Sequence, residues 1–301
     1  MLAGLELSHA EEFLRNHLGA KVTAFERLHG GDWSQAFGFR ADGRDLVARF
    51  GSHVDDFEKD RAAMAISGPG LPVPKVFEIG PAFGGHFCIS ERLYGEMLED
   101  LDASAMRRIV PAVFRLLDAM RLADTNAWTD QVGAPIVSWT EQLLRVDEET
   151  DRVCGWHDKM AVSASGAESY REGLGYLRSH IGSCPQDRHM LHNDLLHGNV
   201  LVRQDSIAGV IDWGCASLGD FLYDLGLFTF YTPWFPHMAG IDWAAKARAH
   251  YAEIGLEVPN FEERLRCYEV HLGLAGMAYC SFISDFGELK AHSDRLMHLI
   301  R

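Results

Sequence analysis

The segment MLHNDLLHGNVLV, residues 190–202, places His192, Asp194 and Asn199 directly before an apolar, β-branched run. A second aspartate, Asp212, follows another apolar run in VIDWG. Phosphoryl transfer needs a carboxylate that positions the attacking hydroxyl and accepts its proton, and it needs oxygen ligands for Mg²⁺. Asp194 suits the first role, and Asn199 and Asp212 suit the second.

The spacing of these residues also suits phosphoryl transfer. Asn199 comes five residues after Asp194, which is the interval from aspartate to asparagine in a kinase catalytic loop. NVLVR and AGVIDW predict two short strands joined by a turn at QDSI. The hairpin would return Asp212 to the side of Asn199, so that the two candidate metal ligands become neighbours.

The chain before this segment is typical of a small antiparallel sheet. Residues 7–19 predict an amphipathic helix with Ser8 as its N-cap and Gly19 at its end. KVTAFERL, AFGFRA and DLVARFG predict three strands of a meander, separated by the turns HGGD and ADGRD. DDFEKDRAAMAIS predicts one helix, and LPVPKVFEIG and HFCISERL predict two further strands.

From about residue 102 onward, helical spacing dominates. A helix is predicted from an apolar face that recurs every three or four residues, with Pro111 expected to kink it: Met106, Ile109, Val113, Leu116 and Met120. TNAWTDQVGAPIVSW, residues 125–139, indicates a loop. Further helices are predicted near 139–150, 166–181, 241–255 and 260–284. The sequence therefore predicts an α+β chain with a β-rich part, a hinge near Glu91–Gly95, and a larger helical part.

Composition limits the class of protein. An apolar fraction of 47% and a charged fraction of 24% over 301 residues are those of an ordinary globular chain. The net charge of −15 argues against nucleic acid as a partner and favours, if anything, a cationic small ligand. No apolar run approaches the length that spans a bilayer and no secretory signal opens the chain, so we expect a cytoplasmic protein without a membrane partner. Six scattered cysteines without a CxxC pair predict reduced thiols.

HNDLLHGNVL…IDWG resembles the catalytic signature of the aminoglycoside phosphotransferase and choline kinase branch of the kinase-like superfamily. GGDWSQAFGF, LVARF, FEKDRA, LPVPKVFEIG and FCISERLYG are similar to the first lobe of the enzymes of this family that act on hygromycin B, and SLGDFLYDL, PWF and HLGL continue the likeness. The resemblance covers about residues 10 to 285. It implies a two-lobed, protein-kinase-like fold, with a nucleotide-binding lobe at 1–93 and a catalytic and substrate-binding lobe at 94–301.

The resemblance also implies roles for the polar residues. Asp194 would be the catalytic aspartate, and Asn199 and Asp212 would hold Mg²⁺ against the ATP phosphates. Arg49 in LVARF takes the place of the usual phosphate-binding lysine, with Asp60 as the acid that positions it.

Further roles concern the nucleotide and the substrate. Ser34 and the backbone of HGGDWSQAF would cover the phosphates, and adenine would meet the hinge near Glu91 and Leu93. Trp234 is either a core aromatic or a flat wall for a sugar ring. Three further residues are expected to support the site, the aspartates either by tying down the catalytic loop or by facing a cationic substrate: His192, Asp220 and Asp224.

The implied function is transfer of the γ-phosphate of ATP, or of GTP, to a hydroxyl of a cationic aminoglycoside, with Mg²⁺ as cofactor and antibiotic resistance as the result. Hygromycin B is the expected acceptor. Another alcohol, such as choline or an amino sugar, stays open, because Gly198 replaces an asparagine of the hygromycin B enzymes and GLAGMAYCSF is small and apolar. A catalytically silent kinase-like binding protein and a metal hydrolase built on His192, Asp194 and His197 are less favoured by the same residues.

Overall fold

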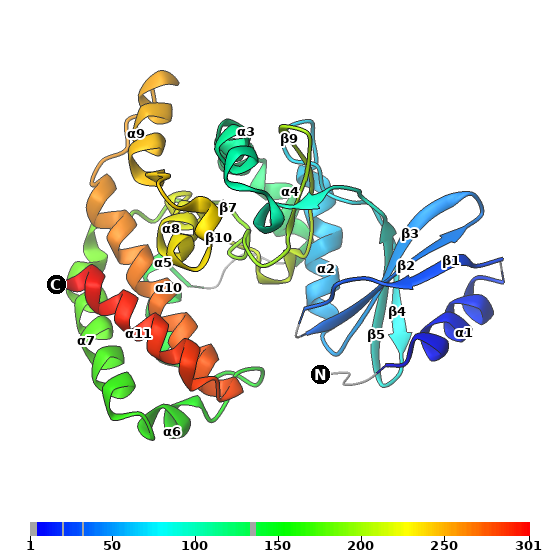
Figure 1. The fold of residues 1–301 in the computed structure, drawn as a ribbon, viewed down its shortest axis with the longest axis horizontal. Coiled ribbons are helices and arrows are strands. Elements are labelled where there is room, and N and C mark those ends of the chain that lie inside the picture. The colour runs from blue at the N-terminus through cyan, green and yellow to red at the C-terminus, as the bar shows by residue number, and fades with distance from the viewer. Residues whose placement is uncertain (1–4, 20, 32, 133–136) are drawn as a thin grey trace. The chain divides into compact units, whose positions relative to one another are not determined.

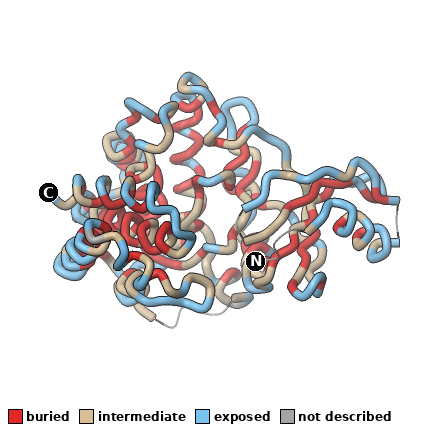
Figure 2. Tube along the Cα trace, turned by 60° about the horizontal axis from the view of Figure 1, so that its bottom comes forward, coloured by how far each residue is buried: buried red, intermediate tan, exposed pale blue. Residues whose placement is uncertain are grey.

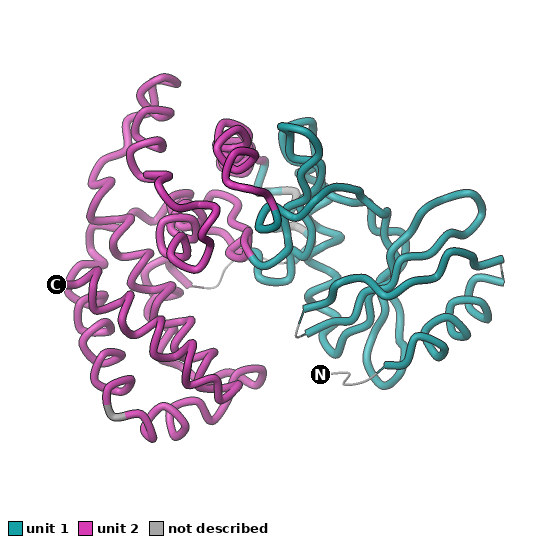
Figure 3. The backbone as a smooth tube through the Cα atoms, viewed as in Figure 1, with its two compact units in different colours: residues 1–100, 124–134, 197–216 teal, residues 101–123, 135–196, 217–301 magenta. Residues whose placement is uncertain are grey.

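A computed structural model describes residues 5–19, 21–31, 33–132 and 137–301 of the chain. Its internal contacts divide the chain into two compact units, which Figure 3 colours separately. Unit 1 comprises Met1–Asp100, Asp124–Ala134 and His197–Ala216, and unit 2 comprises Leu101–Ala123, Pro135–Leu196 and Ser217–Arg301. The division into lobes at residues 1–93 and 94–301 stays a prediction.

Unit 1 is built on an antiparallel sheet with the strand order β1-β2-β3-β5-β4 (Figure 1). The strands are β1 (Thr23–Arg27), β2 (Ser34–Ala41), β3 (Arg44–Gly51), β4 (Val76–Ala82) and β5 (Gly85–Glu91). Antiparallel pairing of β1 with β2 and of β2 with β3 confirms the predicted meander.

The core of this sheet packs against helix α1 (Leu7–Leu18). Ala10 and Leu14 of α1 are buried together with Phe37, Phe50 and Phe87 of the strands. Many of the buried residues of unit 1 in Figure 2 lie in these strands. Gly19 ends α1 in the left-handed region, as predicted.

The predicted N-cap of α1 is wrong. Glu6 occupies that position and Ser8 lies in the first turn, because the carbonyl of Glu6 already accepts bonds from the N–H groups of His9 and Ala10. The first turn of the helix therefore closes two residues earlier than the serine suggests.

Unit 1 also contains a second, smaller sheet with the order β6-β8-β9. Its strands are β6 (Glu96–Met97), β8 (Val200–Arg203) and β9 (Ser206–Val210), and Val200 pairs with Val210. The predicted hairpin around residue 205 is confirmed. The remaining elements of unit 1 are α2 (Val54–Ala63), η1 (Met64–Ile66), η2 (Leu98–Asp100), α4 (Thr125–Val132) and η5 (Trp213–Cys215).

Helix α4 shows that the predicted loop at 125–139 is wrong over its first part. The segment has no clear apolar periodicity, but the indole of Trp128 is buried at 4% exposure and α4 packs against α2. Tertiary contacts therefore decide its conformation. Residues 133–136 of the predicted loop lie outside the described residues.

Unit 2 is mainly helical, as Figure 1 shows. Its helices are α3 (Ala103–Arg121), α5 (Trp139–Leu144), η3 (Arg145–Asp147), α6 (Trp156–Ala161), α7 (Ala164–His180), η4 (Ile181–Ser183), α8 (Leu222–Tyr231), η6 (Thr232–Trp234), η7 (Pro236–Met238), α9 (Trp243–Glu253), α10 (Phe261–Ile283) and α11 (Phe286–Ile300). Strands β7 (His189–Leu191) and β10 (Ser217–Gly219) pair antiparallel. Helix α10 contacts α7, α8 and α11 and is the centre of this packing.

Helices α6 and α8 and strands β7 and β10 were not predicted. Helices α3 and α11 add two further details. Helix α3 continues from Ala103 to Arg121 through Pro111, without a break. Helix α11 was not predicted; Ser284 ends α10 with a φ of 64°, and the Asp285 carboxylate caps α11 by accepting from the N–H groups of Gly287 and Glu288. Within the described ranges, none of the helices combines the length and the apolar character that a bilayer crossing requires.

Candidate active site

The β8–β9 hairpin positions the two candidate metal ligands in unit 1. The carbonyl of Asn199, just before β8, accepts a bond of 2.9 Å from the N–H of Ile211, just after β9. Asp212 follows with φ 60° and ψ 68°, a left-handed conformation that is uncommon for residues other than glycine, although aspartate and asparagine adopt it more often than most. A carboxylate held in such a conformation at a strand end is often part of a functional site. The Asn199 residue is 6% exposed, and the Asp212 side chain is 40% exposed.

Helix α2 fixes the backbone immediately after Asp212. The Asp60 carboxylate accepts a bond of 2.8 Å from the N–H of Trp213, and the Lys59 ammonium donates a bond of 2.8 Å to the carbonyl of Gly214. A Cβ on Gly214 would lie 3.1 Å from Cβ of Asp56, so glycine suits this close approach of η5 to α2. Sequence reasoning missed Lys59, because its partner lies 155 residues away and only the fold brings the two together.

Arg49 on β3 joins two carboxylates of unit 1. Its guanidinium pairs with Asp60, and its Nη1 lies 3.3 Å from Oδ1 of Asp212. Burial disfavours the charged guanidinium, but Asp60 and Asp212 outweigh that effect and raise the pKa of Arg49 above its ordinary value. Burial also raises the pKa of Asp60 to about 6, against the opposing effect of Arg49. The arrangement therefore holds a permanent positive charge beside the Asp212 carboxylate.

The turn before Asn199 is fixed by a residue that sequence reasoning also missed. His197 and Gly198 both have left-handed backbones, with φ of 86° and 82°. The Gly198 N–H donates a bond of 3.1 Å to the Glu99 carboxylate of η2. Glycine adopts this conformation without strain and asparagine tolerates it better than most residues. The family resemblance leads one to expect asparagine at position 198. The glycine found there is compatible with the same turn.

Three other predicted residues also lie in unit 1. Ser34 begins β2 and pairs with Gly51 of β3; the turn before it includes Asp32, which lies outside the described residues. Glu91 ends β5, and its N–H donates to the carbonyl of Lys75. Leu93 follows β5 and packs on the hairpin so closely that a Cβ on Gly209 would lie 2.7 Å from its Cδ1.

In unit 2, the backbone before Asp194 is held by Asp224 of α8. The Asp224 carboxylate is fully buried and accepts two bonds of 2.8 Å, from the N–H groups of His192 and Asn193. Burial raises the pKa of Asp224 to about 7, although both bonds favour the ionised form. The His192 ring is fully buried, and its Nδ1 accepts a bond of 3.3 Å from the Asp194 N–H. This geometry makes His192 and Asp224 supports of the loop that presents Asp194.

Asp220 lies two residues before α8 and is bonded to α10. Its carboxylate has no solvent exposure and accepts two bonds from the Arg264 guanidinium, of 2.9 and 2.6 Å, and one from the hydroxyl of Tyr268. A buried bidentate pair of this kind is directional and positions the helix that carries Asp224.

Trp234 combines an aromatic surface with a nearby acid. Its Nε1–H donates a bond of 2.8 Å to the Glu288 carboxylate of α11. Its ring lies 5.6 Å from that of Phe230 and 4.9 Å from that of His292. The small residues of α10 admit this cluster, because a Cβ on Gly276 would lie 2.3 Å from the His292 ring. The small residues of GLAGMAYCSF therefore have a packing role at this point.

The predicted site residues are thus distributed over both units, and their roles stay predictions. Unit 1 contains Arg49, Asp60, Asn199, Asp212, Ser34, Glu91 and Leu93, and unit 2 contains His192, Asp194, Asp220, Asp224 and Trp234. In the part of the chain that the structure describes, no group of three or more His, Cys, Asp and Glu side chains could hold a metal ion. One carboxylate and one amide oxygen nevertheless suit Mg²⁺, which often binds one or two protein ligands together with nucleotide phosphates and water.

The chain belongs to the phosphotransferase enzyme family, whose model matches residues 25–258. The fold and the catalytic-loop motif agree with this assignment, and the chain is therefore an enzyme of that family. Similar proteins of known structure or activity confirm the predicted resemblance to aminoglycoside phosphotransferases and the kinase-like fold.

A curated relative, hygromycin-B 4-O-kinase of Escherichia coli, is 29% identical over 280 residues, which cover 90% of this chain and 78% of the relative. The crystal structure of a thermostable mutant of aminoglycoside phosphotransferase APH(4)-Ia, in ternary complex with AMP-PNP and hygromycin B, is 27% identical, with a TM-score of 0.82 over 97% of each chain. Another crystal structure of APH(4)-Ia is 26% identical, with a TM-score of 0.84 over 98% of this chain and 99% of that one. The more distant aminoglycoside 2'-phosphotransferase-IIIa, at 17% identity and a TM-score of 0.71, shares the fold over 98% of each chain.

Proposed function

We propose that this phosphotransferase moves the γ-phosphate of ATP to the 4-hydroxyl of hygromycin B, with Mg²⁺ as its metal ion, and so confers resistance to that antibiotic. The observation that carries the proposal is the pair of anchored backbone segments that present Asp194 and Asp212. The 29% identity to hygromycin-B 4-O-kinase, over a region that covers 90% of this chain, supports the choice of acceptor.

Asp194 is the catalytic residue of the proposed reaction. It orients the acceptor hydroxyl and takes its proton as the oxygen attacks the γ-phosphorus. Its backbone position is set by the two bonds that Asp224 accepts from His192 and Asn193, so little reorganisation is needed when the acceptor binds.

Asn199 and Asp212 would supply the protein ligands of Mg²⁺. When bound there, the ion neutralises charge on the nucleotide phosphates. Arg49 contributes a permanent positive charge beside Asp212, and Asp60 orients its guanidinium. Ser34 and the hinge at Glu91 and Leu93 complete the proposed nucleotide site.

Trp234 and Glu288 would bind the acceptor. An indole face favours the apolar face of a sugar ring, and the Glu288 side chain, 49% exposed, favours an ammonium group. The net charge of −15 favours a polycationic acceptor as well. An indole face beside a carboxylate also suits the quaternary ammonium of choline, so the choice of an aminocyclitol over choline rests on the similarity to hygromycin-B 4-O-kinase.

The test is a steady-state assay of ADP formation with hygromycin B, spectinomycin, choline and a panel of further aminoglycosides, each with ATP and with GTP. We expect turnover that depends on hygromycin B and Mg²⁺, with NMR of the product placing the phosphate on the 4-hydroxyl. Asp194→Ala should abolish it. Turnover on choline alone would refute the acceptor, and nucleotide binding without turnover on any acceptor would favour the silent kinase-like protein. Hydrolysis of an acceptor without ATP would favour the metal hydrolase.

A further inference from the structure

The two residues before Asn199 adopt a backbone conformation that needs support from outside the turn. His197 and Gly198 have φ of 86° and 82° in succession. Glycine adopts such a φ without strain, but a residue with a side chain, such as histidine, does so only where the surrounding structure determines it. Because Asn199 follows directly, the orientation of its side chain depends on what holds this turn.

Strand β6 brings a carboxylate to the turn. Met97 of β6 lies opposite Leu201 of β8 in an antiparallel pair. Each step forward along one strand of such a pair corresponds to a step backward along the other, so the residues that follow β6 approach the start of β8. Leu98, which is fully buried, fixes η2 at this point. Glu99 therefore reaches the level of Asn199.

The Glu99 carboxylate is bonded to the turn at one oxygen only. Its Oε1 accepts a bond of 3.1 Å from the Gly198 N–H. Within the described ranges, its Oε2 is buried and has no hydrogen-bond partner. A buried acceptor without a partner disfavours the folded state and is rare in native proteins. The chain therefore keeps an acid at a position where half of the carboxylate adds nothing to stability, and the bond to Gly198 is what this acid provides.

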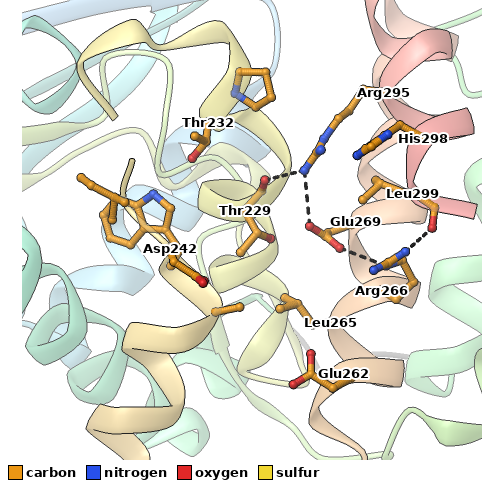
Figure 4. Close-up of a pocket in the computed structure, with 14 residues that line it drawn as sticks. Thr229, Thr232, Asp242, Glu262, Leu265, Arg266, Glu269, Arg295, His298 and Leu299 are labelled. Atoms are coloured by element: carbon orange, nitrogen blue, oxygen red, sulfur yellow. Dashed lines mark hydrogen bonds and ion pairs between the residues drawn. The ribbon is translucent and has the colours of Figure 1, made fainter. Parts of the chain in front are cut away.

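Glu269 of α10 shows by contrast how a buried acid serves packing. It lies 3.5 Å from Arg266 and 3.7 Å from Arg295, as Figure 4 shows for the pocket between α8, α9, α10 and α11. Arg295 belongs to α11, so this ion pair joins two helices. Among the described residues, no lysine or arginine pairs with Glu99 in this way. Its one polar contact is with the backbone beside a predicted metal ligand.

Asn199 is thus fixed from both sides. Its own carbonyl accepts from the Ile211 N–H at 2.9 Å, and the residue before it donates to Glu99. Mg²⁺ demands near-ideal octahedral geometry, so a ligand that can rotate binds it less well. Groups that orient the ligands of a metal ion commonly change its affinity by about 10- to 100-fold.

We propose that Glu99 is a positioning residue of the metal site: its carboxylate fixes the turn at His197 and Gly198 and thereby orients the Asn199 side chain for Mg²⁺. The inference rests on the proposed function, because it takes Asn199 as a ligand of Mg²⁺. It does not depend on which alcohol accepts the phosphate.

The test uses Glu99→Met and Glu99→Gln as a matched pair. Both substitutions keep the length of the side chain, but only glutamine keeps an oxygen that can accept from Gly198. Glu96→Met, at an exposed position of the same strand, is the control. Calorimetry measures the affinity of each full-length protein for AMP-PNP, once with excess Mg²⁺ and once with EDTA. The ratio of the two affinities is the metal-dependent gain, and no acceptor is present.

Glu99→Met should reduce the metal-dependent gain by roughly tenfold and leave the affinity measured in EDTA unchanged. Glu99→Gln and Glu96→Met should keep the gain of the wild type. Hydrogen–deuterium exchange at the Gly198 amide should be several-fold faster in Glu99→Met and unchanged in Glu99→Gln. If Glu99→Met does not fold, Glu99→Asp, whose carboxylate is one carbon shorter, should show the same two effects.

The two possible failures are distinguishable. A metal-dependent gain that is present in the wild type and is retained when position 99 loses its acceptor would overturn the proposal alone, even if exchange at Gly198 becomes faster. The absence of any gain in the wild type would refute the magnesium site of the proposed function, and this inference with it.

Discussion

Replacing Asp224 with asparagine should separate the stability of this enzyme from its activity. The fully buried Asp224 carboxylate accepts one N–H bond at each of its oxygens, from His192 and Asn193. Asparagine keeps one accepting oxygen and presents an NH₂ group to the other N–H. One donor of the loop before Asp194 then loses its acceptor, at a cost of about 1–3 kcal/mol. If this cost appears in the positioning of Asp194, kcat falls roughly ten- to a hundredfold.

The substitution lowers kcat, but at neutral pH it should raise the free energy of unfolding through the loss of this titrating group. Burial raises the pKa of Asp224 from 3.8 to about 7, so between these pH values the folded protein binds a proton that the unfolded chain has lost. The stability associated with this group is present at low pH and is lost as the pH rises through about 7, at about 1.4 kcal/mol per pH unit. Between pH 5 and pH 7 the wild-type protein should therefore lose roughly 2 kcal/mol through Asp224 alone. Asparagine does not titrate, so the variant should keep this stability.

Urea unfolding of both proteins at intervals from pH 5 to pH 8 measures the effect. All other titrating groups, Asp60 included, contribute alike to the two curves, so their difference isolates Asp224. The same series of kcat values should rise with pH through about 7 for the wild type, as the ionised carboxylate forms both bonds, and this step should be absent from the variant. Parallel stability curves, with a constant difference across that range, would refute the assignment of a raised pKa to Asp224.

Three further substitutions test unit 1. Arg49→Met should raise the KM for ATP and lower the free energy of unfolding by about 3 kcal/mol, because Asp60 loses its partner while buried; an unchanged KM would remove Arg49 from the phosphate site. Asp212→Ala should abolish turnover and lower the free energy of unfolding by about 1 kcal/mol, because alanine tolerates the φ of 60° less well than aspartate does, and measurable activity would contradict its role as a metal ligand. Gly95→Ala should lower the free energy of unfolding by about 1–3 kcal/mol, because its Cβ would lie 2.7 Å from the Val202 carbonyl oxygen; wild-type stability in urea unfolding would show that β6 and β8 can separate without cost.

The sequence predicts those parts of the fold that depend on local pattern. Alternating strands, turn residues and the Asp194-to-Asn199 interval lie within short windows, and the meander and the β8–β9 hairpin follow from them. Helix α4 is different, because its sequence lacks a clear periodicity and its conformation depends on packing against α2. Helix α11 escaped prediction because no glycine or proline marks the junction at Ser284, where serine itself adopts the left-handed turn.

The candidate site positions and several of their supports, Asp60, His192 and Asp224, were predicted, but Lys59 and Glu99 were not. Asp194, Asn199 and Asp212 lie in one recognisable motif. Lys59 and Glu99 act on backbone groups 155 and 99 residues away, and nothing in their own surroundings in the sequence distinguishes them from ordinary exposed charges. A bond from a side chain to a distant backbone group leaves no periodic signal, so contacts of this kind require coordinates.

Both units use the same means to hold the backbone beside a carboxylate of the predicted site. Asp60 accepts the N–H of the residue that follows Asp212, and Asp224 accepts the N–H groups of the two residues that precede Asp194. Burial raises the pKa of both acceptors, to about 6 and about 7, so each of them, when ionised, lowers the stability of the folded chain at neutral pH. A neutral side chain at position 224 would not titrate but could not accept both bonds, and one at position 60 would leave the buried Arg49 without this partner. The lost stability is therefore the cost of two fixed backbone segments, and activity should decline in mild acid, where these two carboxylates become protonated, while the folded state becomes more stable through the same two groups.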